Sequence, residues 1–347
     1  MLKIPFLKFM IFVLLILVFD LNKPVYSKTT SPSNILAEKK STIKKIISNS
    51  LEESQINHVK NWIKKSEELL KNINYSVPTD LSLVIESSGE MGRFESWNNT
   101  IYSNVRTDSP NSIERELGEL LHEYGHAIFN TIMMQKSDLI YQYLMYYNEY
   151  ASLTVGLMKH YNYDIHAIPT MIENYIKMGE LNKAHDWQQD LIELKNAKNR
   201  YDELEAKLAN LKIPLNTLKA YSELVADTWV VVILGNLKSM RIALEDPNEI
   251  IDSDVNTNAK LEARDYSLNK KSFDTNKTFD EYEISSLTKS FLGQRLEGKS
   301  LSERVRIFDL LIEAILKDVN NWNYSTSEKS VLDFNKFLID FMEKSNL

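Results

Sequence analysis

The chain has 347 residues, no cysteine, 43% hydrophobic residues and a formal net charge of −7 at pH 7. The lack of cysteine excludes disulfides and a lipid-modified N-terminal cysteine, and the acidic balance argues against nucleic acid as a partner, because its binding requires a basic surface. Few glycines and prolines, together with long Leu, Lys and Glu patterns, predict an α+β protein that is mostly α-helical.

The first 27 residues predict a signal peptide. Lys3 and Lys8 precede an apolar run from Phe9 to Phe19, which is too short for a typical membrane span but suits the core of an export signal. Val25-Tyr26-Ser27 offers a cleavage site. We therefore expect a secreted or periplasmic protein without membrane contact after cleavage. The alternative is an uncleaved membrane anchor.

Residues 28–75 are predicted to form an N-terminal helical segment, with two amphipathic helices between Asn34 and Asn72 that are broken near Ser48 to Ser54. Residues 76–136 then combine a small sheet with a helix that carries the most informative motif of the chain. Period-two patterns bounded by Ser-Gly and Asn-Asn turns mark the strands. They run from Leu81 to Glu86, from Gly92 to Ser96 and from Thr100 to Val105.

His122, Glu123 and His126 form an HExxH motif, with Tyr-Gly in the middle. Residues four apart share one face of a helix, so the two imidazoles can bind one metal ion while Glu123 faces the water bound to it. A helix is predicted because Asn111 and Glu114 form a capping box and leucines follow at helical spacing. The motif indicates a zinc hydrolase; a helix with two ordinary histidines is the alternative.

A hydrolytic zinc site takes a third protein ligand and leaves the fourth position to water. Ala220 to Leu234 is predicted to form an apolar helix that places Glu223 and Asp227 on one face. Buried carboxylates are costly unless they bind a cation or accept hydrogen bonds, so Glu223 is a candidate third ligand. Other candidates lie between the two helices: His160, His166 and His185.

The HEYGH and ELVAD segments together resemble the signature of the gluzincin metallopeptidases, HExxH followed downstream by ExxxD or ExxAD. The resemblance covers only these two short segments, with a long gap between them. It implies a zincin-like two-lobed fold with a small sheet before the active-site helix. It also implies His122, His126 and Glu223 as zinc ligands, Glu123 as the general base and Asp227 as the carboxylate that orients a ligand histidine.

In this reading zinc activates a water and polarises the substrate carbonyl, while Glu123 accepts the proton and delivers it to the leaving amine. The oxyanion requires a further donor; Tyr221 is the first candidate, with Tyr282 and Arg295 as alternatives. In the zincin plan an edge strand pairs with extended substrate. Thr100 to Val105 is the candidate for that role, and an ordinary edge strand is the alternative.

Residues 137–215 are predicted to form a large helical insertion, shaped as a hairpin. Its first part is rich in tyrosine, which indicates a core or alternatively a lining of the substrate cleft. Its second part, from Ala184 to Lys212, is charged and is predicted to be solvated or to bind a protein partner. Residues 216–347 form a helical C-terminal lobe. That lobe contains a long loop, Ile251 to Lys277, and helices at Glu281 to Leu296, Leu301 to Asn320 and Ser327 to Glu343.

We therefore expect an exported zinc-dependent endopeptidase that acts on peptides or proteins. A zinc amidase or aminopeptidase acting on small or cell-wall peptides is one alternative. A non-catalytic binding protein with a vestigial zinc site is another. The presence of Glu123 argues against the last, because a purely structural zinc site has no use for a general base.

Overall fold

The computed structural model describes most of the chain beyond residue 41 and leaves the predicted signal peptide outside its scope. The described ranges are 42–48, 51–86, 92–104, 113–157, 168–245, 261–270, 282–323 and 326–345. The chain is mostly α-helical and has a small mixed sheet, which confirms the predicted class. It divides into a larger unit, residues 39–142 and 212–347, and a smaller one that contains residues 143–211.

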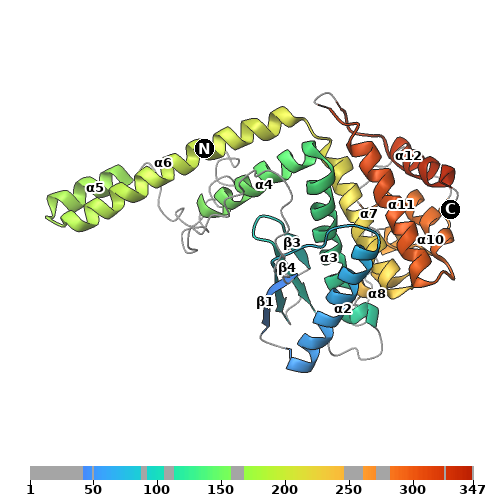
Figure 1. Cartoon of the computed structure of the whole chain (residues 1–347). Helices are drawn as coiled ribbons and strands as arrows, with labels where there is room; N and C mark the ends of the chain where they lie inside the picture. The colour runs from blue at the N-terminus through green and yellow to red at the C-terminus, as the bar shows by residue number, and fades with distance from the viewer. Residues whose placement is uncertain are drawn as a thin grey trace, which may run out of the picture. The chain divides into compact units, whose positions relative to one another are not determined.

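Helix α3, Ile113–Lys136, carries the HExxH motif through the middle of the larger unit. It packs against α7 (Leu215–Leu234), α8 (Ser239–Leu244) and the sheet, and Figure 1 shows it between the strands and α7. Its leucines and isoleucines from Leu117 onward are buried, as their helical spacing predicts. Neighbours on several sides therefore enclose the motif.

The sheet has the strand order β1-β2-β4-β3, with β1, β2 and β4 parallel and β3 antiparallel to β4. Strand β4 therefore has a partner on each side, and β1 and β3 are the edges. The prediction that Thr100 to Val105 forms an edge strand is wrong; Val105 lies outside the described residues. The strands are β1 Ile43–Ser48, β2 Leu81–Glu86, β3 Arg93–Glu95 and β4 Thr100–Asn104.

Strand β1 corrects the prediction of two helices between Asn34 and Asn72. Ile43, Ile46 and Ile47 have helical spacing, yet they lie in a strand that pairs with β2. The register shifts between Ile43 and Lys45, and such a bulge changes the alternation of side chains. Ile43 and Ile46 can thus both be half-buried while Ile47 is 41% exposed.

The other helices of the larger unit support α3 and α7. Helix α2, Glu53–Asn72, is the predicted second N-terminal helix, and a capping box between Glu52 and Gln55 closes its start. Trp229 of α7 stacks at a tilt on Phe308 of α11, with ring centroids 4.9 Å apart. The C-terminal helices are α10 Ser286–Leu296, α11 Leu301–Val319 and α12 Val331–Lys344.

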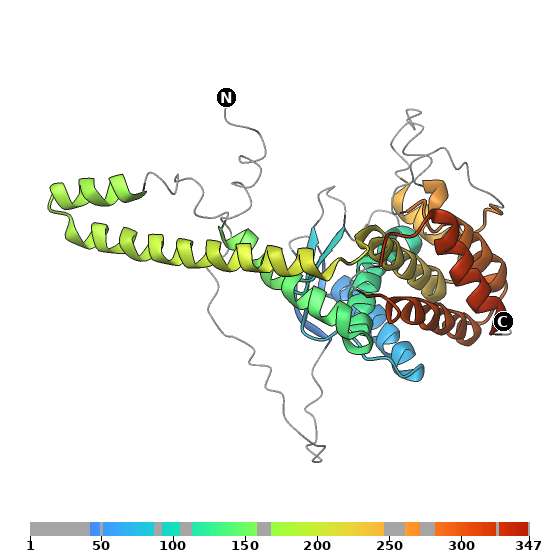
Figure 2. The same ribbon diagram turned by 90° about the horizontal axis from the view of Figure 1, so that it is seen from above.

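The smaller unit contains most of α4, Asp138–Leu157, and the helices α5, Ile168–Lys177, and α6, Leu181–Leu211. Figures 1 and 2 both show α5 and α6 side by side, as predicted for a helical hairpin. Tyr150 stacks on Tyr201 and their hydroxyls are hydrogen-bonded, so this part of the tyrosine cluster belongs to a core. Among the helices that the structure describes, none combines the length and apolarity that a bilayer crossing requires.

Candidate metal centre

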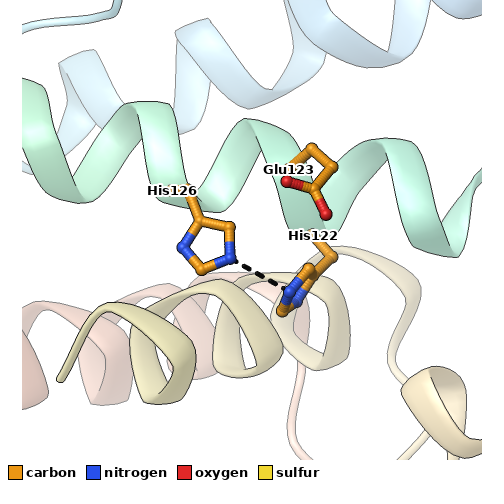
Figure 3. A group of neighbouring side chains, drawn as sticks. All are labelled: His122, Glu123 and His126. Atoms are coloured by element: carbon orange, nitrogen blue, oxygen red, sulfur yellow. Dashed lines mark hydrogen bonds between the residues drawn. The ribbon is translucent and has the colours of Figure 1, made fainter. Parts of the chain in front are cut away.

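Helices α3 and α7 bring two imidazoles and one carboxylate together. His122 Nε2 lies 3.1 Å from His126 Nε2, and the Glu223 oxygens lie 3.4 Å from the first nitrogen and 3.5 Å from the second. Figure 3 shows both rings between α3 and the neighbouring helix. The approach of Glu223 to the histidines, expected at roughly 3 to 4 Å for ligands of one ion, is confirmed.

Small residues at the contact between α3 and α7 make this approach possible. A Cβ atom added to Gly125 would lie 2.6 Å from Cα of Ala226. Gly125 is the fourth residue of HEYGH, and Ala226 stands between Glu223 and Asp227 in the second motif. The two helices can touch backbone to backbone only because neither position carries a larger side chain. The spacing residues of the motifs therefore set the distance between their ligands.

Glu123 is placed next to the histidines on the same helix. One nitrogen or oxygen atom of each of His122, Glu123 and His126 lies within 4.8 Å of the other two. Figure 3 shows the Glu123 carboxyl beside His122. Burial, with the nearby charges of Glu223 and Glu119, raises the pKa of Glu123 to about 7 despite the opposing effect of His122. A carboxyl with a pKa near neutrality can both accept and return a proton.

Each histidine has a polar partner for its other ring nitrogen. Nδ1 of His126 lies 2.8 Å from the hydroxyl of Ser222. Nδ1 of His122 lies 3.0 Å from Oδ1 of Asp227, a charge contact whose angles do not meet those of a hydrogen bond. Both rings thus turn Nε2 toward Glu223. The predicted place of Asp227 beside one of the two histidines is confirmed, whereas Ser222 was not predicted.

Two buried cations behind the carboxylates were not predicted from the sequence. Arg264 follows a helical turn at 261–263, and its guanidinium lies 3.3 Å from Glu223 and 3.5 Å from Asp227. Nζ of Lys289, on α10, lies 2.6 Å from Oδ2 of Asp227. Burial alone would raise the pKa of Asp227, but Arg264 and Lys289 outweigh it and hold that pKa far below its usual range.

The histidines respond to the same charges. Burial lowers the pKa of His122, yet its contacts with Asp227 and Glu223 outweigh burial and raise it to about 9. For His126 burial dominates and lowers the pKa to about 4. Burial also opposes ionisation of Glu223, but the two histidines and Arg264 hold its pKa at about 2. The surroundings therefore favour a charge on His122 and on Glu223 and oppose one on His126.

Other predicted residues are not brought to this cluster. Tyr221 is fully buried and its hydroxyl donates to Asp318 of α11, so the structure places this hydroxyl on another carboxylate and its catalytic role stays a prediction. Arg295 lies over the ring of Phe291 on its own helix. Tyr282 does lie near, because its ring faces the guanidinium of Arg264 at 4.0 Å. His185 is exposed on α6. His160 and His166 lie outside the described residues.

The donor set fits a tetrahedral metal ion. Ligands at about 2.0 to 2.1 Å from such an ion are separated by about 3.3 Å. The two Nε2 atoms are 3.1 Å apart, and the nearest Glu223 oxygens, Oε2 for His122 and Oε1 for His126, lie at 3.4 and 3.5 Å. His122 and Glu223 are also close enough to Asp227 to form a second overlapping group. The side chains of Glu223 and His126 remain 15% and 16% exposed against 5% for His122. Solvent therefore reaches the cluster from the side of His126 and Glu223.

Comparison of the chain with protein-family models, with curated proteins and with solved structures found no match.

Proposed function

We propose that this chain is a zinc-dependent peptidase of the gluzincin type with a zincin-like two-lobed fold. His122, His126 and Glu223 hold the metal, and Glu123 is the general base. The observation that carries the proposal is the meeting of two Nε2 atoms and one carboxylate at 3.1 to 3.5 Å, with a second carboxyl of raised pKa beside them. Export through a signal peptide at residues 1–27 belongs to the same proposal.

The bound zinc would lower the pKa of water toward neutrality and polarise a substrate carbonyl. Glu123 accepts the proton of the attacking water and delivers it to the leaving amine. Ser222 and Asp227 hold the imidazoles in the orientation that presents Nε2. Arg264, which stands against Glu223 and Asp227, keeps both as carboxylates.

The edge strand β3 supports an extended peptide as substrate. It pairs only with β4 in the described sheet, and an edge strand can add a peptide through its backbone groups. Gly92, next to the start of β3, packs on Glu119 of α3. A Cβ atom added to Gly92 would lie 2.6 Å from the carboxylate of Glu119. Glu119 stands one helical turn before Glu123. The start of β3 therefore lies beside α3 one helical turn before the proposed base, and we propose that a peptide added to β3 passes Glu123.

The test combines metal analysis with a digestion assay on the purified protein. We expect one zinc per chain and internal cleavage of casein that a chelator abolishes and added zinc restores. A matched protein with Glu123→Gln should retain its zinc and cleave nothing. Cleavage that releases only N-terminal residues would indicate the aminopeptidase alternative. Zinc bound by both proteins without hydrolysis of any peptide by the wild type would contradict the enzymatic proposal.

A further inference from the structure

Lys289 is the most deeply enclosed cation near the proposed centre. Its residue is 1% exposed, and its ammonium lies 2.6 Å from Oδ2 of Asp227 and 3.5 Å from the carbonyl oxygen of Tyr282. A buried ammonium is costly unless it is paired. The side chain forms no hydrogen bond or ion pair with a proposed ligand in these interactions, so its direct contact with the centre is Asp227, and it reaches Glu223 and Arg264 only through longer-range charge.

The two oxygens of Asp227 have different neighbours. Lys289 takes Oδ2, while Oδ1 faces Nδ1 of His122 at 3.0 Å and Arg264 at 3.5 Å. The ammonium therefore fixes the rotation of the carboxylate about its last bond. Without that contact Oδ2 would be buried with no donor, and the carboxylate would turn toward Arg264 to recover one.

The position of Lys289 is itself fixed by the C-terminal helix. Oδ1 of Asn335, on α12, accepts hydrogen bonds from the backbone nitrogen and the hydroxyl of Thr288, each at 2.8 Å. Its amide nitrogen donates to the carbonyl of Ile284 at 2.6 Å. Asn335 thus anchors the start of α10 one residue from Lys289. A continuous line of contacts joins α12 to His122.

We propose that Lys289 is a positioning residue for the metal centre. Its ammonium holds Asp227 in the rotation that presents Oδ1 to His122, and this contact aims Nε2 of His122 at the metal. The role rests on the proposed metal site. Partners of ligand histidines typically affect metal affinity by about 10- to 100-fold, and Lys289 should act on zinc binding through Asp227 by a similar factor.

The chain offers a matched control for this role. Lys329 makes a comparable contact with a buried carboxylate, at 2.6 Å from Oδ1 of Asp318, but Asp318 has no contact with the histidines among the described interactions. Replacing either lysine by methionine removes one ammonium from one aspartate. Both changes should lower the melting temperature, and only one should change zinc binding.

The experiment measures the dissociation constant of zinc by competition with a chromophoric chelator, on full-length protein. We expect Lys289→Met to raise it by about 10- to 100-fold, and Lys329→Met to leave it unchanged. Lys289→Gln keeps a hydrogen-bond donor but no charge, and it should raise the dissociation constant of zinc by a smaller factor. This variant tests the positioning role if Lys289→Met does not fold. The double variant Asp227→Asn with Lys289→Met should bind zinc no more weakly than Asp227→Asn alone.

The possible outcomes separate the two proposals. Zinc binding by Lys289→Met that equals that of the wild type, with a lowered melting temperature, would make Lys289 a stabilising residue only and overturn the positioning role. Additive losses in the double variant would also overturn it, because Lys289 would then act independently of Asp227. A wild-type protein that binds no zinc would overturn the metal site and this role together.

Discussion

Helix α7 lies between two buried carboxylate clusters that differ in what surrounds them. Around Asp318 every neighbour is a donor: Tyr221 and Trp322 donate to Oδ2 at 2.7 and 3.1 Å, and Lys329 donates to Oδ1 at 2.6 Å. Around Glu223 the closest neighbours include two imidazole nitrogens 3.1 Å apart, which a single proton can bridge. Both oxygens of Asp318 accept from donors, whereas around Glu223 two imidazole nitrogens and the carboxylate converge at ligand spacing beside the guanidinium of Arg264.

The difference shows which buried carboxylates indicate chemistry. Burial and a charged partner are common to both clusters, so neither property identifies a reactive site. The histidine cluster differs in that two imidazole nitrogens and a carboxylate lie at ligand spacing and that Glu223 and His126 are partly exposed. The proposed metal ion would be a further partner for this set. The experiments that follow test whether the two clusters really divide into a metal site and a structural one.

The largest effect is expected from Glu123→Gln. The amide keeps the shape of the side chain but cannot accept a proton, so hydrolysis should fall by about 10²- to 10⁴-fold. Zinc content and melting temperature should stay close to those of the wild type, because Glu123 is not among the proposed ligands. Metal analysis, thermal unfolding and peptide hydrolysis on one preparation check this. Turnover at the wild-type rate would exclude the proposed base.

Loss of the third ligand should come next. Glu223→Gln should weaken zinc binding by more than the roughly 10- to 100-fold expected for Asp227→Asn, since the first removes a ligand charge and the second an outer partner. Chelator competition measures both. An unchanged zinc stoichiometry in Glu223→Gln would move the third ligand elsewhere, to His160, His166 or His185. Equal losses in the two variants would contradict the distinction between ligand and partner.

The close contact of the two motif helices provides a third test. Gly125→Ala would place a methyl group against the backbone of Ala226, at 2.6 Å before relaxation. Overpacking of this kind costs about 1–3 kcal/mol, and a displacement of α7 by about 1 Å can reduce catalysis by about 10²-fold. Activity and thermal unfolding together measure the two effects.

Gly118 is the control for that change. A Cβ added there would lie 2.6 Å from Cβ of Ala243, on α8. Gly118→Ala should therefore lower stability by a similar amount through α8, which carries no proposed ligand, and should leave zinc affinity unchanged. If both variants lose zinc equally, the contact between Gly125 and Ala226 has no special part in setting the ligand spacing.

The sequence predicted the cluster of histidines and carboxylates because its members follow local rules. His122 and His126, like Glu223 and Asp227, are spaced by one helical turn, and that period depends only on the helix that contains them. The HExxH helix, the ELVAD helix and the hairpin of the insertion were predicted for the same reason. Strand β1 was not, because a bulge altered the alternation of its isoleucines.

The residues that the sequence did not reveal act across the fold. Arg264 lies in a segment without a period, and only tertiary packing brings it to Glu223. Lys289 did leave a signal. It shares a helical face with buried Ser286, Gly293 and Leu296. A lysine on a buried helical face indicates a buried partner of opposite charge. The identity of that partner, Asp227, required the structure.

The smallest effect is expected at the structural cluster, from Tyr221→Phe. The change removes the hydroxyl that donates to Asp318 and should cost about 1 kcal/mol, with zinc affinity and hydrolysis unchanged. Burial and Asp318 raise the pKa of Tyr221 well above 10.0. The folded state thus favours the neutral phenol. The contribution of Tyr221 to the free energy of unfolding is therefore complete below pH 10 and declines as the pH rises above that value. The difference in melting temperature between wild type and variant should therefore be larger at pH 8 than at pH 11. A loss of hydrolysis in Tyr221→Phe at pH 8 would instead place this hydroxyl in the reaction and erase the distinction between the two clusters.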